Sequence, residues 1–496
     1  MNRNLKGLLI ALAVYGTAFA STDNNKTHLN VRIDRDSVPA YTTFHKMVAD
    51  KDEDRLGGSV EATGHYGRSV NASHLAKSFG ADGTGSINVI AGPMTARFTP
   101  IRTDVVSDLI LHVQGGSNKN ALAGVLNFAP KQTVYGLRLD YFQSFDKWVD
   151  GLFLHVILPF EHMTNDINMT IPTDTEASED SVKLKDLFTG KAITRTAPEN
   201  VHTALKYAKM NNNSETGLGD IEARIGWNFL DGKKYHAGIH AAVVFPTGDE
   251  ANEEFLWGAQ TGDSKWGIGL GTDASALLWE EDEQSLTLLG CLQYKYLFEG
   301  DEKRNIGFKE LRYTDDGTAR DIVVNPIASL YYQVGEVGVK GLQPLANVST
   351  LDVDVKPGSQ IDGTVSLAYT NGGFTLDLGY NLFWKEAESV TLSSAWNDEK
   401  YGVARKLYDA TAAFGAAGAD TLAENTTGWI KKADLDFDGA ATSSIIKHKV
   451  FTGVGYVAKT WEYPVMAGAG IAYELPSSNR NATEGYSFWV KLGASF

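Results

Sequence analysis

Apolar and polar residues alternate along much of this chain, and the clearest stretch is its end. From Tyr486 to Phe496 every second residue is apolar, while the residues between them are mostly small or polar. A period of two predicts a β-strand whose two faces meet different surroundings. Such a strand would extend for about 36 Å, well beyond the usual strand of about five or six residues.

The same period recurs upstream, often around a recognisable turn. Residues 371–373 (Asn-Gly-Gly) join two alternating stretches and give the strongest hairpin signal, and residues 231–232 (Asp-Gly) join another pair. The pattern predicts strands over residues 55–66, 121–128, 135–141, 148–160, 220–229, 235–245, 266–270, 286–298, 349–355, 365–369, 374–384, 450–456, 465–475 and 484–496, with weaker candidates at 101–114 and 322–334.

Turn lengths alternate as well. Short turns near residues 145, 231, 281, 372 and 461 alternate with long insertions, which is typical of transmembrane β-barrels. We therefore predict an all-β, closed antiparallel transmembrane barrel of sixteen strands, or of fourteen if one uncertain hairpin does not span. The long loops, in which short helices are expected near 199–210 and 400–423, cover residues 70–100, 162–216, 247–263, 300–320, 387–446 and 476–484.

The first twenty residues have the parts of a secretory signal peptide. Arg3 and Lys6 precede an apolar run, and small residues ending at Ala20 form a cleavage site. No later segment reaches the roughly 18 consecutive apolar residues of a membrane-spanning helix. We expect removal of the signal peptide (1–20), an N-terminal periplasmic tail or plug (21–53), and a barrel in the cell outer membrane (54–496).

Composition narrows the possible functions. The formal net charge is −16, and it becomes −18 once Arg3 and Lys6 are removed. This acidity argues against binding to nucleic acid and would bias a pore towards cations. Cys291 is the single cysteine of the sequence, so neither an intramolecular disulfide nor a thiolate metal cluster can form.

With the apolar face of each strand turned to lipid, the opposite face points into the barrel. Charges of both signs fall on that face, where they are costly in a dry core but ordinary in a water-filled lumen. Most should be solvated or paired, and a subset could select a solute. The candidates are Glu61, His65, Arg138, Asp140, Asp220, Glu222, Arg224, His236, His240, Asp377 and Lys491.

Motifs of catalysis are missing from the sequence, which contains no G-x-S-x-G, H-E-x-x-H or P-loop. His236 and His240 resemble a metal-binding pair. On a strand, however, they would lie about 13 Å apart, too far to chelate one ion unless another strand supplied partners. We predict a protein without enzymatic activity.

One external loop resembles half of a calcium site. Asp434, Asp436 and Asp438 alternate before a glycine, as in the first half of a calcium-binding loop, but Ile445 stands where a bidentate Glu belongs. We predict no cofactor, with a calcium ion at these three carboxylates as the alternative to a plain Asp/Gly turn.

A short motif pair carries a family resemblance. The tetrapeptide GLGD at 217–220 opens one predicted strand, and PTG at 246–248 closes the next. This pair is similar to that of the fatty-acid and aromatic-hydrocarbon channel superfamily, including its phenol-degradation group. The resemblance implies passive uptake of small, often hydrophobic molecules through a barrel of roughly fourteen strands with an N-terminal plug. The strongly charged lumen face departs from that pattern.

These observations predict an outer-membrane channel for passive diffusion of small solutes through a polar, acidic-biased lumen. The alternatives are a plugged transporter for hydrophobic or aromatic compounds, and a surface recognition or adhesion barrel that acts through its long loops. The expected partners are outer-membrane lipid, small solutes and the barrel-assembly machinery, for which Phe496 would be the assembly signal. The oligomeric state stays open.

Overall fold

The computed structural model describes the greater part of the chain. The described residues are 26–29, 57–79, 85–90, 104–106, 124–171, 184–191, 203–232, 234–315, 318–323, 325–339, 341–403, 429–458, 463–476 and 483–496. The predicted signal peptide, most of the predicted tail or plug, and residues 404–423 of the predicted helical loop lie outside them.

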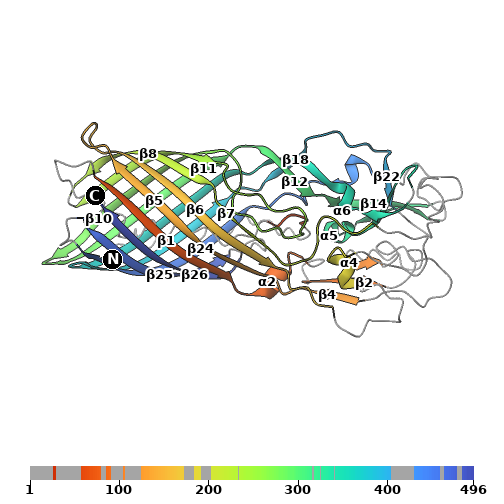
Figure 1. The fold of residues 1–496 in the computed structure, drawn as a ribbon, viewed down its shortest axis with the longest axis horizontal. Helices are drawn as coiled ribbons and strands as arrows, with labels where there is room; N and C mark the ends of the chain where they lie inside the picture. Colours follow the sequence, from red (N-terminus) through yellow and green to blue (C-terminus); the bar gives the residue numbers. More distant parts are fainter. Residues whose placement is uncertain are drawn as a thin grey trace, which may run out of the picture.

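Twelve antiparallel strands close into a barrel (Figure 1). In ring order they are β1 (Gly58–Ser69), β5 (Lys131–Ser144), β6 (Leu152–Asp166), β8 (Ile221–Asp231), β9 (Tyr235–Phe245), β10 (Gly267–Glu281), β11 (Gln284–Leu297), β19 (Gly358–Asn371), β20 (Phe374–Lys385), β24 (Ile445–Ala458), β25 (Val465–Pro476) and β26 (Gly485–Ser495). A shorter strand, β7 (Asn213–Leu218), pairs with β6 just ahead of β8, so β7 and β8 are two parts of one wall position.

The wall strands have two different faces, which confirms the predicted barrel type. They are 11 to 15 residues long, which is enough for tilted strands to cross a bilayer. Outward positions are apolar and exposed, as at Ile225 and Trp227 on β8 and at Ile239 and Val243 on β9. Inward positions are mostly small or polar and are enclosed. Lipid solvates the first face, and the barrel interior holds the second.

The last strand closes the ring. β26 pairs with β25 on one side and with β1 on the other over its whole length. Phe496 and Gly58 then exchange two backbone hydrogen bonds of 2.9 Å. Because hydrocarbon offers no partner to an unpaired strand edge, this seam is what allows the sheet to exist in a bilayer.

The predicted count of sixteen or fourteen strands is wrong. The predicted strands at 101–114, 121–128, 322–334 and 349–355 do not span. Their described parts form short strands beyond the barrel, such as β4 (Gly124–Asn127) and β18 (Thr350–Lys356), and 322–334 also contains a short helix. These elements are too short to cross a bilayer. Their apolar residues, including Leu126, Val353 and Val355, are buried by other loops.

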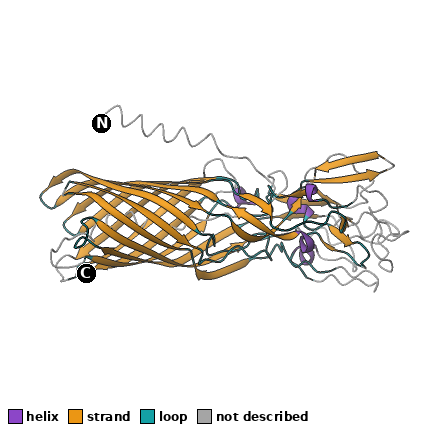
Figure 2. Cartoon of the chain, turned by 90° about the horizontal axis from the view of Figure 1, so that it is seen from above, coloured by secondary structure: helices purple, strands orange, loops and turns teal. Residues whose placement is uncertain are grey.

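Those other loops fold into a cap at one end of the barrel, whereas the C-terminus and the short turns lie at the other (Figures 1 and 2). A hydrophobic core holds the cap together, and described residues of every long-loop region except 476–484 contribute to it. Trp257, Tyr331 and Phe308 are among its largest fully buried side chains. Besides β4 and β18, the elements of this end are α2 (Ala72–Ala76), β2 (Ser86–Ile90), β3 (Asp104–Val106), α4 (Leu184–Phe188), β12 (Gly300–Asn305), β13 (Gly307–Phe308), β14 (Glu310–Asp315), β15 (Thr318–Val323), α5 (Pro326–Ser329), β16 (Gln333–Glu336), β17 (Gln343–Pro344), α6 (Ala346–Ser349), β21 (Ser389–Leu392), β22 (Tyr401–Val403), the 3-10 turn η7 (Lys432–Asp434) and β23 (Leu435–Asp436).

The cap also contains residues from far upstream. The N-terminal tetrapeptide, residues 26–29, lies in the cap, where Leu29 belongs to the hydrophobic core and the Thr27 N–H donates to Gly439 O at 2.9 Å. β1 begins at Gly58, beside the C-terminus. Residues 29 and 58 therefore lie at opposite ends of the barrel.

Helices are short in the described part of the chain, with four or five residues each. The helix expected near 199–210 is wrong where it can be compared, because residues 203–210 have no helical turn. No helix among the described residues is long and apolar enough to cross a membrane.

The seam between β26 and β1 gives a first prediction. Phe496→Ala keeps the backbone pairing but removes a ring that packs outward beside Gly58. We expect a several-fold lower amount of folded protein in the outer membrane, measured as the heat-modifiable band on gels. Phe488→Ala, which removes an equally exposed ring of the same strand face, should change it much less. Equal losses in the two variants would refute a special role for the terminal residue.

Candidate functional site

All but one of the predicted lumen residues lie at inward positions of wall strands. They are Glu61 and His65 on β1, Arg138 and Asp140 on β5, Glu222 and Arg224 on β8, His236 and His240 on β9, Asp377 on β20 and Lys491 on β26. Asp220 is the exception, since it lies between β7 and β8 and binds a loop.

The inward charges are brought together with opposite charges. Lys491 Nζ lies 2.5 Å from a Glu61 oxygen. On the next strand pair, Arg138 and the His155 ring approach Asp140 at 2.7 and 2.9 Å. The carboxylates of Glu61 and Asp140 are almost fully enclosed. Because a removed partner would leave a buried charge, these pairs fix the geometry of the lumen more than they add net stability.

A further cluster of three charged residues lies on β24 and β25, partly outside the predicted strands. Lys447 and Lys449 of β24 lie 3.0 and 3.6 Å from Glu474 of β25, and all three are buried. The predicted strand began only at residue 450. Continuing its period backwards by two pairs of residues would have placed both lysines on the inward face.

A polar crossbar joins β8 to β11 across two intervening strands. We use this name for Glu222, Arg224, Gln293 and Lys295. Glu222 accepts hydrogen bonds from Arg224 Nε at 2.6 Å and Gln293 Nε2 at 2.7 Å, and it pairs with Lys295. Arg224 Nη2 also donates to Gln293 at 3.3 Å.

Glycine makes room for the crossbar. The intervening strand β10 has only glycine at its first three inward positions, so no side chain separates β9 from β11 there. A Cβ at Gly271 would lie 2.3 Å from the His240 ring, and one at Gly269 would lie 3.4 Å from the Lys295 side chain. The glycines thus let long side chains of neighbouring strands lie flat on the wall.

Glycines make room for large inward side chains elsewhere in the barrel as well. Inward rings lie over glycines of adjacent strands, where an added Cβ would come within 3 Å of the ring. These pairs are His65 over Gly136, Phe153 over Gly226, Phe451 over Gly379, and Trp489 over Gly470. Trp489 and Phe451 are each 2% exposed and Asp377 is 0% exposed. These inward side chains are therefore enclosed in this section of the barrel interior.

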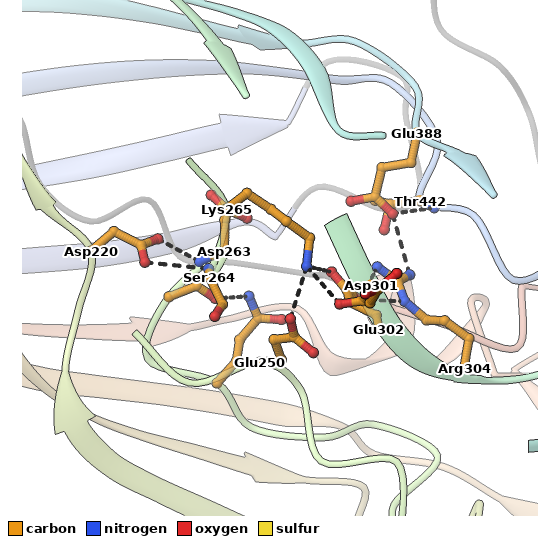
Figure 3. Close-up of polar contacts among 12 residues, drawn as sticks. Asp220, Glu250, Asp263, Ser264, Lys265, Asp301, Glu302, Arg304, Glu388 and Thr442 are labelled. Carbon is orange, nitrogen blue, oxygen red and sulfur yellow. Dashed lines mark hydrogen bonds and ion pairs between the residues drawn. The ribbon is translucent and has the colours of Figure 1, made fainter. Parts of the chain in front are cut away.

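Asp220 and the GLGD and PTG motifs form a loop clamp. Asp220 accepts backbone hydrogen bonds from Gly248 at 3.0 Å and from Asp263 at 2.6 Å (Figure 3). Thr247 Oγ1 donates to Gly219 O at 2.7 Å and accepts from Ile221 N at 2.9 Å. The two motifs meet because together they fasten the loop between β9 and β10 at the break between β7 and β8. Their role here is structural.

A network of buried charges joins the barrel to the cap (Figure 3). Arg304, at the end of β12, contacts Glu302 at 2.6 Å and Glu388 at 3.2 Å. Glu388 also pairs at 2.9 Å with Lys385, the last residue of β20. Arg304 donates further to Ala440 O at 3.0 Å. We call Arg304, Glu302, Glu388 and Lys385 the junction network.

The loop between β9 and β10 adds a cation to this network. Lys265 Nζ lies 2.8 Å from Glu250 and 3.1 Å from Glu302. Sequence analysis did not predict the junction network. Arg304, Glu302 and Glu388 fall in predicted loops without a sustained period, and no local signal pairs Arg304 with Glu388, which is 84 residues away.

Neighbouring charges shift the pKa values of Glu388 and Arg304 in the junction network. Burial alone would raise the pKa of Glu388, but Lys385 and Arg304 outweigh it and hold that pKa well below its usual range. Burial also opposes the charge of Arg304, and Glu302 and Glu388 outweigh it, which raises the guanidinium pKa. Glu388 and Arg304 therefore both stay charged at neutral pH.

The side chains of the two candidate metal sites, the His236/His240 pair and the Asp434–Asp438 loop, contact other protein groups. His236 lies 3.2 Å from Asp273, whereas His240 is enclosed beside the crossbar. In the loop, Asp434 accepts from Lys431 N and Asp436 accepts from Gly439 N, each at 2.9 Å. Among the described residues no group of three or more His, Cys, Asp or Glu side chains is arranged to hold a metal ion. The alternative of a calcium ion stays a prediction.

Comparison with known proteins finds likeness in structure only. No family profile matches the chain, and no curated protein matches it in sequence. An outer membrane channel from Pseudomonas putida F1 aligns with a TM-score of 0.37 at 11% identity, covering 89% of this chain and 96% of that one. The transport unit of the autotransporter AIDA-I from Escherichia coli gives 0.33 at 9%, covering 92% and 95%.

A FadL homologue from Pseudomonas aeruginosa gives a TM-score of 0.26 at 8% identity, covering 89% of this chain and 90% of that one. These likenesses concern the barrel fold alone. The architecture of the chain itself, a closed antiparallel barrel with an apolar outer band and a polar interior, is that of an outer-membrane β-barrel protein.

The junction network gives a prediction about the cap. Glu388→Gln leaves the buried cations Arg304 and Lys385 without their shared carboxylate, which should cost about 3 to 5 kcal/mol of cap stability. Since the pKa of Glu388 is lowered in the folded protein, its contribution is full above about pH 4.3 and falls as the pH drops further. Hydrogen exchange of β12 and β18 peptides, read by mass spectrometry, measures the change.

Asp352→Asn is the matched control. It breaks the exposed 3.9 Å pair between Lys303 of β12 and Asp352 of β18, which should cost no more than about 1 kcal/mol. Similar exchange rates in Glu388→Gln and Asp352→Asn would show that the junction network does not hold the cap.

Proposed function

We propose that the protein is an outer-membrane channel that passes small solutes along the inward face of its barrel. The closed barrel with a polar, ion-paired interior is the observation that supports this most directly. If the barrel only anchored its loops in the membrane, it would not require so many enclosed charges, because charges are costly to bury in a dry interior.

Selectivity should depend on the polar crossbar. Its acid Glu222 and its bases Arg224 and Lys295 lie on one side of the wall, and Lys295 keeps about a quarter of its side chain exposed (26%). We propose that these charges decide which solutes pass. The overall acidity of the chain favours cations, but the inward carboxylates of Glu61, Asp140, Glu222 and Glu474 are each paired with a nearby base, so the bias should be modest.

The resting channel should be closed, as in the plugged-transporter alternative. The N-terminal tetrapeptide lies in the cap and Gly58 at the far end of the barrel, and the sequence between them includes Arg32 and Asp34 among other charges. A path outside the barrel would expose these charges to hydrocarbon, which is strongly unfavourable. We therefore propose that the predicted N-terminal segment (21–53), most of which lies outside the described residues, serves as a plug.

Recognition through the cap is the second candidate. The long loops share a hydrophobic core instead of extending separately into solvent, and such a rigid surface is suited to a macromolecular partner. Under this hypothesis, changes in the cap would alter partner binding and leave solute flux unchanged. We propose no catalytic role.

Planar-bilayer recordings test the channel. We expect rare, small openings from the intact protein and steady conductance from a variant lacking the whole predicted tail or plug, residues 21–53. Liposomes that contain the intact protein should likewise swell more slowly in small sugars than liposomes that contain the deletion variant. If the deletion variant is folded, as judged by heat modifiability, and still gives no conductance, the channel hypothesis fails. Equal conductance from both proteins would instead refute the plug.

The crossbar predicts a shift of selectivity in two directions. Lys295→Met removes a lumen cation and should move the reversal potential under a salt gradient towards cations. Glu222→Gln should move it towards anions. Glu283→Gln, at the short turn between β10 and β11, changes the same net charge outside the lumen and should leave the potential unchanged. Equal potentials in all three variants would exclude the crossbar as the selective element.

A further inference from the structure

The N-terminal tetrapeptide, residues 26–29, bridges two cap segments that are distant in the sequence. Thr27 donates through its backbone N–H to Gly439 O at 2.9 Å and through its hydroxyl to Asn305 O at 2.6 Å. Asn305 ends β12, whereas Gly439 belongs to the turn after β23. The ladder next to this bridge, between β13 and β23, has only two residue pairs. Thr27 therefore extends a short contact between the two segments.

Other residues of the tetrapeptide add a cation and an apolar side chain. Lys26 Nζ donates to Asp438 O at 2.7 Å, so an ammonium group lies at the Asp434–Asp438 turn, where the sequence suggested a calcium ion. Leu29 is 4% exposed within the hydrophobic core. The tetrapeptide thus presents a cation, a hydroxyl and an apolar side chain, and its surroundings complement each of them.

The surroundings of the tetrapeptide have the character of a recognition site. All three acceptors, on Asn305, Asp438 and Gly439, are main-chain carbonyls, whose positions the fold determines. The Asn305 side chain donates to Glu253 O at 3.2 Å and accepts from Thr350 at 2.7 Å, which fixes the β12 side of the site. Asn305 and Gly439 are buried. Since buried carbonyls without partners are unfavourable, this site favours an occupant.

We propose that Asn305 and the turn at 438–439 form a peptide-binding site, whose intramolecular ligand is residues 26–29. The ligand class is a short peptide with a basic residue, a hydroxyl residue directly after it, and an apolar residue two positions later. If the predicted signal peptide is removed after Ala20, only residues 21–25 precede the tetrapeptide. The ligand can then leave without displacing a wall strand, and its departure would loosen the contact between β12 and the turn after β23.

Binding in trans tests the site. In the full-length protein, purified in detergent, residues 26–29 are replaced by Gly-Ser-Gly-Ser, which keeps the chain length and the predicted cleavage site. The probe is a fluorescein-labelled peptide of residues 21–31, followed by fluorescence anisotropy. We expect saturable binding to this replacement variant. Binding to the unaltered protein should be at least about tenfold weaker, because a tethered ligand competes at a high effective concentration.

Altered peptides show which groups are recognised. Thr27→Val keeps the side-chain shape but removes the hydroxyl donor, so the peptide should bind about fivefold more weakly. Leu29→Ala removes apolar contact with the core and should weaken binding at least about tenfold. Thr22→Val makes the same chemical change outside the tetrapeptide and should leave the affinity unchanged. Equal affinities of all the peptides would refute specific recognition.

Hydrogen exchange, read by mass spectrometry, tests whether the ligand holds the two segments together. In the replacement variant, peptides that cover residues 300–308 and 434–441 should exchange several-fold faster than in the unaltered protein. Saturating peptide 21–31 should restore the slower exchange. Peptides that cover β16 and β17, elsewhere in the cap, should not change.

Three results from a folded replacement variant would overturn the proposal: unaltered exchange of both segments, no binding of the peptide, or binding as strong to the unaltered protein as to the variant. If the variant does not fold, as judged by heat modifiability, Leu29→Ala in the full-length chain weakens the intramolecular ligand instead. The natural peptide should then bind this variant more tightly than the unaltered protein. Failure of both variants to fold would make the tetrapeptide part of the folding core and would also overturn the proposal. Neither readout depends on whether the barrel conducts.

Discussion

Closure of the backbone hydrogen-bond ring is the constraint on which this molecule depends. A strand in hydrocarbon has no water to satisfy its N–H and C=O groups, so each wall strand needs a neighbour on both sides. β26 completes the ring, because it pairs with both β25 and β1 and ends with the Phe496–Gly58 pair. The outward apolar face and the inward polar face both follow from this closed wall.

The small circumference of a twelve-stranded barrel brings inward side chains within reach of one another. Acids and bases on neighbouring strands pair directly, as Lys491 does with Glu61. The crossbar extends this pairing over two strands because glycine leaves the wall of β10 bare. The lumen is thus shaped by where side chains are absent as much as by where they are present. Substitution of an inward glycine should disturb it as much as substitution of a charge.

The fold of the cap depends on a different constraint, the burial of apolar loop surface. Its loops contain too much apolar surface to remain in water, and no single loop can bury its own share. Packed together they form one core around Trp257 and Tyr331, while the junction network fixes this core to the barrel through Arg304 and Glu388. The N-terminal tetrapeptide joins the same region, so the described chain begins in the cap and enters the wall at the opposite end.

The sequence by itself determined the barrel type, the inward or outward direction of most wall residues, and the terminal strand. These depend on a period of two over 11 or more residues, which only a wall between lipid and lumen requires. The number of strands was decided by the tertiary structure. Residues 349–355 alternate as the wall strands do, but Val353 and Val355 are covered by the cap core, and local sequence cannot distinguish that cover from lipid.

The candidate site likewise contains some residues that the sequence predicts and some contacts that only the tertiary structure shows. Residues such as Glu222 and Arg224 were found because their direction is a property of their own strand. Their partners Gln293 and Lys295 lie on β11, and only the closed barrel brings them together. The junction network had no local sequence signal, because the contacts of Arg304 with Glu388 and with Ala440 join residues that are 84 and 136 positions apart. Local periodicity reports which environment a residue faces, whereas chain folding decides which residues meet there.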